Sequence, residues 1–299
     1  MKNAYFKYVV ALLLFGSNGI VASYILLNSY EIVYLRTLIG SIFLIFVFVL
    51  AKQKMQFWKN KSHLLYLVIS GVAMGASWIF LFEAFAQIGV SIATLAYYCG
   101  PVIVMILSPL LFKEKMTSAK LLGFLAVIIG MVCVNGQAFI EGKISMGLIF
   151  GILSAFMYVI MVVFNKKAIS ITGLENATCQ LAVSFLTVAI FMGLKQGFSV
   201  HIVEGNWIPI LVLGVVNTGI GCYFYFSSIG HLPVQSVSIL GYLEPLSALI
   251  FSAAILGETL SPLQIAGAVF ILGGAAYGEM FRSKSKNNAH NESYKVENT

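Results

Sequence analysis

Ten long apolar runs fill almost the whole chain and restrict what it can fold into. They cover residues 8–27, 32–51, 64–86, 91–112, 119–137, 146–164, 175–194, 207–228, 234–256 and 262–280. Each run is close to the about 20 residues that a helix needs to cross a bilayer. Because the runs are continuous, rather than short segments of alternating polarity, they exclude the strands of a membrane β-barrel. The sequence predicts an all-α integral membrane protein with ten transmembrane helices.

The composition supports lipid as the solvent of these helices. Hydrophobic residues make up 60% of the 299 residues and charged residues 10%, which is too little charge for the surface of a soluble domain. The net charge of +7 does not indicate a nucleic-acid-binding protein, because the lysines lie in short loops and tails. We therefore expect the lipid bilayer, and no nucleic acid, as a partner.

The chain also repeats itself. The stretch 95–102 (LAYYCGPV) returns, displaced by 144 positions, as 239–246 (ILGYLEPL). This offset aligns Val90 with Val234, Tyr98 with Tyr242, Pro101 with Pro245, Ser108 with Ser252, Glu114 with Glu258, Gly123 with Gly267 and Gly130 with Gly274. The sequence thus predicts two five-helix repeats, at residues 1–137 and 138–281. The polar tail at 282–299 is expected to be disordered.

The distribution of lysine and arginine predicts the orientation. If the N-terminus is cytoplasmic, fifteen of these residues fall on the inner side, Lys143 and Lys195 fall on the outer side, and Arg36 lies within a span. Both termini are then cytoplasmic. Because each repeat has an odd number of spans, the second enters the membrane upside down, and the two form an inverted repeat.

Two prolines interrupt corresponding apolar runs. Pro101 and Pro245 each remove a backbone donor near the middle of a run, so we expect a kink or break at both places. Matched interruptions in two halves of a membrane protein point to a substrate site. Glu114 and Glu258 precede the next runs, and we interpret both as caps of the helices that follow them, with a role as gates as the alternative.

Residues that many enzyme classes need are missing from the sequence. All eleven acidic residues are glutamates, so no aspartate is available for an aspartyl dyad or an aspartyl-phosphate. The sequence has no G-x-x-x-x-G-K-[ST] or H-E-x-x-H motif, and its four cysteines lack the spacing of metal ligands. We predict no enzymatic activity, no cofactor and no metal site.

Ionisable residues inside the spans are few, and a charge at the bilayer centre costs about 2.5–3.5 kcal/mol even on a lenient scale. Glu244 lies near the middle of its run, where the first repeat has the uncharged Gly100. Either it hydrogen-bonds a neighbouring helix or it meets substrate or a proton. Arg36 and Glu83 lie at similar depth, so they are candidates for an ion pair or for coupling to substrate, unless each reaches the headgroups alone.

Uncharged polar and aromatic residues complete the candidate set. Any of them can line a cavity or pack in a helix seam, and the tyrosines rank first because they flank the two breaks. The candidates for substrate binding are Glu244, Tyr98, Tyr242, Asn18, Trp78, Asn217 and Gln180.

The pieces from Pro101 to Glu114 and from Pro245 to Glu258, with their following glycines, resemble the drug/metabolite transporter superfamily, specifically bacterial EamA-type permeases. The resemblance covers residue 4 to about 280. It implies a secondary transporter of the bacterial inner membrane that alternates between outward and inward openings. The acid that small multidrug pumps carry in their first span is missing, since Gly16-Ser-Asn18 occupies that region.

The leading hypothesis is a transporter that moves a small polar metabolite, an amino acid or amine-like compound, in the direction of export. Proton coupling and oligomeric state stay open. The alternative is a membrane scaffold or sensor that keeps the repeat but transports nothing.

The topology can be tested with single cysteines in a chain whose native cysteines are replaced. Cysteines at Lys54, Lys166 or Ser285 are expected to react with an impermeant thiol reagent only from the cytoplasm, and those at Lys143 or Lys195 only from outside. Reaction of the cysteines at positions 54 and 143 from the same side would contradict the predicted inverted repeat.

Overall fold

The computed structural model describes residues 2–135, 146–198, 200, 202, 205–257 and 261–278, and every regular element in them is helical. The elements are α1 (Lys2–Gly16), α2 (Asn18–Ser23), α3 (Ser29–Leu50), η1 (Phe57–Lys59), α4 (Lys61–Tyr97), α5 (Cys99–Phe112), α6 (Ser118–Asn135), α7 (Met146–Lys167), α8 (Gly173–Lys195), α9 (Trp207–Leu211), the π-helix η3 (Val212–Ile220), α10 (Gly221–Ile229), α11 (Val234–Gly241), α12 (Leu243–Leu256) and a last helix, Pro262–Gly278. The predicted tail at 282–299, Lys143 and Glu258 lie outside the described residues.

Many of these helices have the length and composition of membrane spans. Within the described ranges, seven helical stretches are long and apolar enough to cross a membrane, and they are Lys2–Ser23, Ser29–Leu50, Lys61–Ile88, Met146–Lys167, Gly173–Lys195, Trp207–Ile229 and Val234–Ile255. Three shorter apolar helices accompany them, at Cys99–Phe112, Ser118–Cys133 and Pro262–Gly278. The chain is therefore a multi-pass helical membrane protein.

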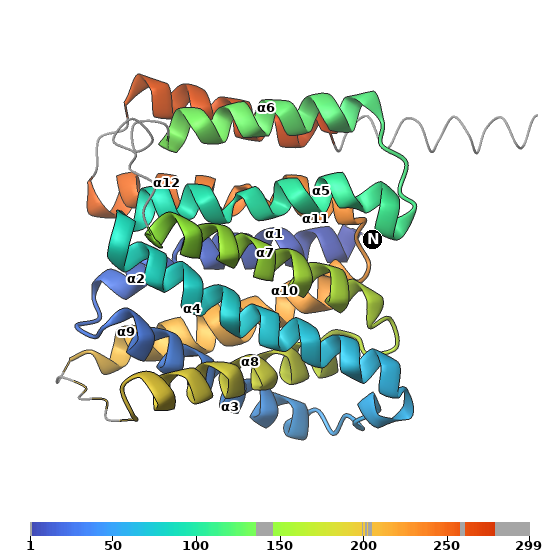
Figure 1. Cartoon of the computed structure of the whole chain (residues 1–299), viewed down its shortest axis with the longest axis vertical. Helices are drawn as coiled ribbons and strands as arrows, with labels where there is room; N and C mark the ends of the chain where they lie inside the picture. The colour runs from blue at the N-terminus through green and yellow to red at the C-terminus, as the bar shows by residue number, and fades with distance from the viewer. Residues whose placement is uncertain are drawn as a thin grey trace, which may run out of the picture.

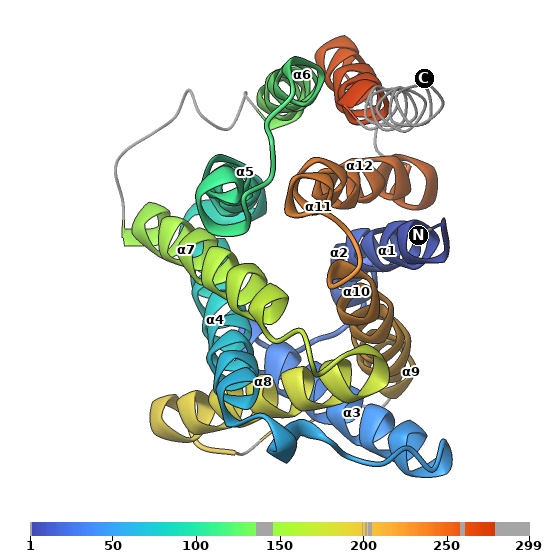
Figure 2. The same cartoon turned by 90° about the vertical axis from the view of Figure 1, so that its right-hand side faces the viewer.

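The helices form one bundle and run roughly along a common direction (Figure 1). The N-terminus lies at one end of the bundle, together with the connections α3–α4, α5–α6, α7–α8 and α10–α11 (Figures 1 and 2). We call this end the N-terminal face.

Helix α4 is longer than one crossing because it doubles back. Ala84 and Ala96 are 12 positions apart, which corresponds to about 18 Å along a straight helix. Yet a Cβ atom on Gly151 of α7 would lie 3.9 Å from the Cβ of Ala84 and 2.8 Å from that of Ala96. The helix therefore reverses its course between the two alanines, so the part before the reversal and the part after it run antiparallel beside α7.

Helix α6 and the last helix cross at two pairs of glycines. A Cβ atom on Gly123 would lie 2.5 Å from the carbonyl oxygen of Gly274, and one on Gly130 would lie 2.6 Å from the carbonyl oxygen of Gly267. Only glycine permits such close approach of two backbones. Each contact is the counterpart of the other under the offset of 144 residues, because Gly267 and Gly274 correspond to Gly123 and Gly130.

Both proline-containing runs are divided just before the proline. Tyr98 separates α4 from α5 and Tyr242 separates α11 from α12, with nearly identical backbone angles of φ −73°, ψ 1° and φ −73°, ψ −4°. Each proline then lies in the first turn of the following helix, where its missing N–H leaves no intrahelical bond unmade.

Glu114 caps a helix in the other half of the chain. Its two carboxylate oxygens accept hydrogen bonds from the backbone N–H groups of Val234 (2.7 Å) and Gln235 (3.1 Å), at the start of α11. The prediction that Glu114 caps the helix following it, α6, is wrong, because Thr117 takes that place and accepts from the N–H of Lys120. A carboxylate at α11 satisfies two donors and meets the positive end of the helix dipole.

We expect Glu114→Ala to lower the free energy of unfolding by about 2 kcal/mol, because it removes two charge-assisted hydrogen bonds. Thermal unfolding in detergent measures the effect. Lys115→Ala, at the exposed neighbouring position, is the control and should change stability by less than about 0.5 kcal/mol. Equal melting temperatures for the two variants would contradict the cap.

Candidate functional site

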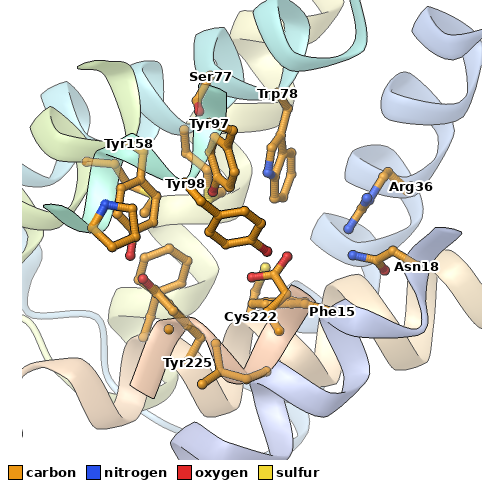
Figure 3. Close-up of a pocket in the computed structure, with 17 residues that line it drawn as sticks. Phe15, Asn18, Arg36, Ser77, Trp78, Tyr97, Tyr98, Tyr158, Cys222 and Tyr225 are labelled. Carbon is orange, nitrogen blue, oxygen red and sulfur yellow. The ribbon is translucent and has the colours of Figure 1, made fainter. Parts of the chain in front are cut away.

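A cavity lies inside the bundle, with about 660 Å³ of empty space when the open space at its mouth is included. Its walls come from α1, α2, α3, α4, α5, α7, α10, α11 and α12, so both halves of the chain contribute. Figure 3 shows its lining, in which aromatic side chains meet a few polar ones.

Two residues of opposite charge, Arg36 of α3 and Glu244 of α12, line this cavity. Arg36 is only 4% exposed, and its Nε donates a hydrogen bond of 2.9 Å to Oγ1 of Thr218. Its guanidinium group lies 4.8 Å from the centre of the Trp78 ring, which adds a cation–π contact. These two contacts hold the cation in place and leave its remaining N–H groups on the cavity side.

The carboxylate of Glu244 has fewer protein partners. The Tyr98 side chain is its hydrogen-bonding neighbour, and Arg36 acts on it electrostatically without a direct ion pair between these two described residues. Glu244 is half-buried, and it lines the cavity. A carboxylate in this position is available to a cationic group of a solute or to a proton.

Asn18 adds a donor beside Arg36. The side-chain amide of Asn217 donates hydrogen bonds to the Asn18 carbonyl oxygen (3.0 Å) and to the Leu14 backbone oxygen (2.9 Å). The N–H groups of the Asn18 side chain are thereby left free for the cavity. Figure 3 shows Arg36 and Asn18 side by side, both directed toward the centre. Together they form the end of the cavity that is rich in donors.

Tyrosines form the opposite wall (Figure 3). The Tyr97 ring makes T-shaped contacts with Tyr98, at 5.2 Å between centroids, and with Tyr158, at 5.5 Å. Gly100 lets Tyr158 approach, because a Cβ atom there would lie 2.8 Å from its Cδ1. The faces of such rings attract cations and pack against apolar groups.

The cavity gathers most of the residues that the sequence singled out. Its lining includes Glu244, Tyr98, Asn18, Trp78, Arg36 and Pro101. Tyr242, Asn217, Gln180, Glu83 and Pro245 are not among the lining residues.

The remaining polar candidates support the structure around the cavity. The Tyr242 ring packs at a tilt against that of Tyr98, at 5.8 Å between ring centroids, and the Tyr242 hydroxyl donates a hydrogen bond of 2.8 Å to the Tyr98 backbone oxygen. Gln180 lies between α8 and its neighbours, where it donates to Oγ of Ser70 (2.9 Å) and accepts from Asn165 (3.3 Å). Gln180, Ser70 and Asn165 are all buried, so these hydrogen bonds satisfy polar atoms whose burial without partners would cost free energy.

Sequence reasoning missed Tyr158 and Tyr225, which line the cavity from α7 and α10. Neither residue lies near a proline, a charge or a repeated motif. The available signal was a phenol group inside an apolar run, and this signal does not distinguish these two residues among the 14 tyrosines of the chain. Only the packing of distant helices selects these two.

An apolar helical bundle that encloses a cavity with opposite charges has the architecture of a solute-handling membrane protein. The comparisons with known proteins agree: residues 2–136 and 145–277 match the EamA-like transporter family. The chain belongs to this family, and the resemblance noted in the sequence is confirmed. The family and its relatives are described as transporters rather than enzymes.

Two relatives and one structure illustrate the match. An uncharacterised transporter of Bacillus subtilis, YxxF, is 26% identical over 300 residues, which cover 99% of this chain and 95% of that protein. A Salmonella typhimurium protein named "Probable amino-acid metabolite efflux pump" is 28% identical over 196 residues, 61% of this chain and 65% of that protein. A solved crystal structure matches with a TM-score of 0.80 and 18% identity, covering 93% of this chain and 98% of that one, and shares the fold.

The ion pair between Arg36 and Glu83, one of the alternatives from the sequence, is not formed. Arg36 contacts Thr218 and Trp78, whereas Glu83 accepts a hydrogen bond of 2.8 Å from Gln87 in its own helix. We therefore expect the effects of Arg36→Ala and Glu83→Ala on stability to add, to within about 0.5 kcal/mol.

Thermal unfolding of both single variants and the double variant in detergent measures this additivity. Arg36→Ala should be the more destabilising change, because it removes a buried hydrogen bond to Thr218 and a cation–π contact with Trp78. A double variant more stable than Arg36→Ala alone would indicate that Arg36 and Glu83 do form an ion pair.

Proposed function

We propose that the protein is a secondary transporter that exports a small polar metabolite, an amino acid or amine-like compound, by alternating access. The single observation that carries this proposal is the cavity between the two halves, with Arg36 and Glu244 on its walls. A membrane scaffold or sensor has no need of two charges inside its apolar bundle, where each costs free energy. The cavity therefore favours transport over the scaffold or sensor.

The arrangement of charges favours a zwitterion. A carboxylate of the solute would meet Arg36 and the Asn18 amide, and an ammonium group would meet Glu244 and the faces of the tyrosines. The apolar part of the solute would pack against the rings. The name of the Salmonella relative, which refers to amino-acid metabolites, agrees with this chemistry.

We further propose that residues 1–137 and 138–281 form inverted five-helix repeats, with ten spans, both termini in the cytoplasm and the bacterial inner membrane as the location. The seven longer and three shorter apolar helices of the described ranges support ten spans. The reciprocal contacts Gly123–Gly274 and Gly130–Gly267 support a two-fold relation between the repeats. A two-fold axis that exchanges each residue with its counterpart in the other repeat converts the first contact into the second. Such repeats alternate around a site near mid-membrane.

Glu244 is the residue we propose for coupling. A proton and the ammonium group of a solute compete for one carboxylate, and this competition is sufficient for antiport. In this proposal Arg36 orients the solute, and Glu83 has no part in coupling because it is not among the residues that line the cavity.

We expect Glu244→Gln to fold normally but to lose transport driven by a pH gradient, because glutamine keeps the shape of the side chain and cannot exchange a proton. Purified protein in liposomes should be screened over amino acids and matched amines without a carboxylate, with and without the gradient. Exchange of substrate for substrate should survive in this variant.

Glu83→Gln provides the comparison, since it removes a carboxylate outside the cavity, and its gradient-driven transport should equal that of the unmodified protein. Full gradient-driven transport by Glu244→Gln would exclude Glu244 from coupling. Absence of any flux from the unmodified protein over the whole panel would favour the scaffold or sensor.

A further inference from the structure

A second cavity lies between the central one and the N-terminal face. It has about 510 Å³ of empty space, open space at its mouth included, and its walls are the end of α7, the start of α8 and the end of α10. These ends lie at the N-terminal face of the bundle (Figures 1 and 2). We call this space the vestibule.

The vestibule and the central cavity follow one another along the same two helices. On α7, Met161 lines the central cavity and Asn165, one turn or about 6 Å further along, lines the vestibule. On α10, Cys222 lines the central cavity and Gly230 lines the vestibule. The two spaces are therefore consecutive in the direction in which a solute would cross the membrane.

Phe226 lines both spaces. Its side chain is 3% exposed, and its ring makes a T-shaped contact with that of Tyr225 at 5.0 Å between centroids. The next turns of α7 and α10 toward the N-terminal face carry polar groups, including Asn165 and Ser227. An apolar ring between two spaces that both contain polar groups is a barrier to water and to charged solutes.

The wall of the vestibule is fixed by the backbone of the turn that joins α10 to α11. Nζ of Lys166 donates hydrogen bonds to the carbonyl oxygens of Ile229 (3.0 Å) and Leu232. These bonds satisfy carbonyls at the end of α10 and place a cation where the helix dipole is negative. The turn is held, whereas the Phe226 side chain can move by a rotamer change.

We propose that Phe226 is the gate between the central cavity and the vestibule, and that the solute passes between the cavity and the N-terminal face through this vestibule. The inference rests on the proposed transport function and adds the route and the residue that closes it. With Phe226 in the observed position, the central cavity is shut off from the N-terminal face. Displacement of the ring joins the two spaces into one path.

Cys222 provides a reporter for this gate, because it lines the central cavity one turn before Phe226 and is 1% exposed. Replacement of Cys99, Cys133 and Cys179 by serine leaves it as the only thiol. Phe226→Ala should raise its rate of reaction with an impermeant, cationic methanethiosulfonate added at the N-terminal face by about tenfold, which corresponds to about 1.4 kcal/mol in the opening equilibrium. The rate from the opposite face should not change.

Phe224→Ala is the matched control, since Phe224 is on the same helix, is half-buried and lines neither space. It should leave the rate unchanged. Phe226→Leu keeps an apolar side chain and should give an intermediate rate, which guards against a folding defect in the alanine variant. Equal rates in the Phe226→Ala and Phe224→Ala variants would overturn the gate.

The vestibule is tested separately with Ser227→Cys in a chain that lacks the native cysteines. Ser227 lines the vestibule but not the central cavity, so this thiol should react from the N-terminal face whether residue 226 is phenylalanine or alanine. Failure to react from that face would overturn the route.

Labelling needs no substrate, so the outcome is independent of the proposed function. Faster labelling of Cys222 in Phe226→Ala, with no flux in liposomes, would uphold the gate and exclude transport of the solutes tested. Flux in liposomes with an unchanged labelling rate would uphold transport and exclude Phe226 as its gate.

Discussion

The hydrogen bond from the Tyr242 hydroxyl to the backbone oxygen of Tyr98 is the contact on which the centre of this protein depends. A break in a helix inside a membrane frees backbone carbonyls, and lipid offers them no donor. Both runs break at equivalent positions, and the tyrosine of the second break supplies the donor for the first. The carbonyl of the first break thus has its donor in the second half of the chain, and this contact holds the two breaks together beside the cavity.

The site arises because the two halves differ at this centre. Gly100 gives Tyr158 of α7 room to pack against α5, whereas its counterpart Glu244 extends a carboxylate into the cavity. Tyr98 then has Glu244 as its side-chain partner instead of repeating the bond that Tyr242 makes. A pair of identical halves would place either two acids or none at this position. One acid opposite one arginine gives the cavity a direction, with a donor end and an acceptor end.

Much of this could be predicted from the sequence, because lipid imposes simple rules. Apolar run length gives the helices, proline marks the two breaks, and the cost of a buried charge marks Arg36 and Glu244. The partners of these residues could not be predicted, because they are set by helix packing between distant segments. Arg36 meets Thr218, which is 182 positions away, and Glu114 caps α11 rather than the helix that follows it.

The reversal inside α4 lies where the sequence separates two runs, although the structure does not interrupt the helix there. The sequence places two runs there, at 64–86 and 91–112, yet the helical hydrogen-bonding pattern continues to Tyr97. Periodicity predicts which face of a helix is apolar, but it does not predict the helix that covers this face. The tyrosines of α7 and α10 were missed because their role depends entirely on that pairing.

On the proposed mechanism, the two charges of the cavity also decide when it can close. Closing an empty cavity would take Arg36 and Glu244 away from water without giving either a partner of opposite charge, and such a loss costs several kcal/mol for each ion. A bound zwitterion pairs both groups at once and adds no net charge. Closure is then favourable with the solute bound and unfavourable without it. A proton on Glu244 removes one of the two charges, so protonation also lowers the cost of closing the empty site. The empty transporter can then change its opening from one side of the membrane to the other with Glu244 protonated, but not with the free carboxylate.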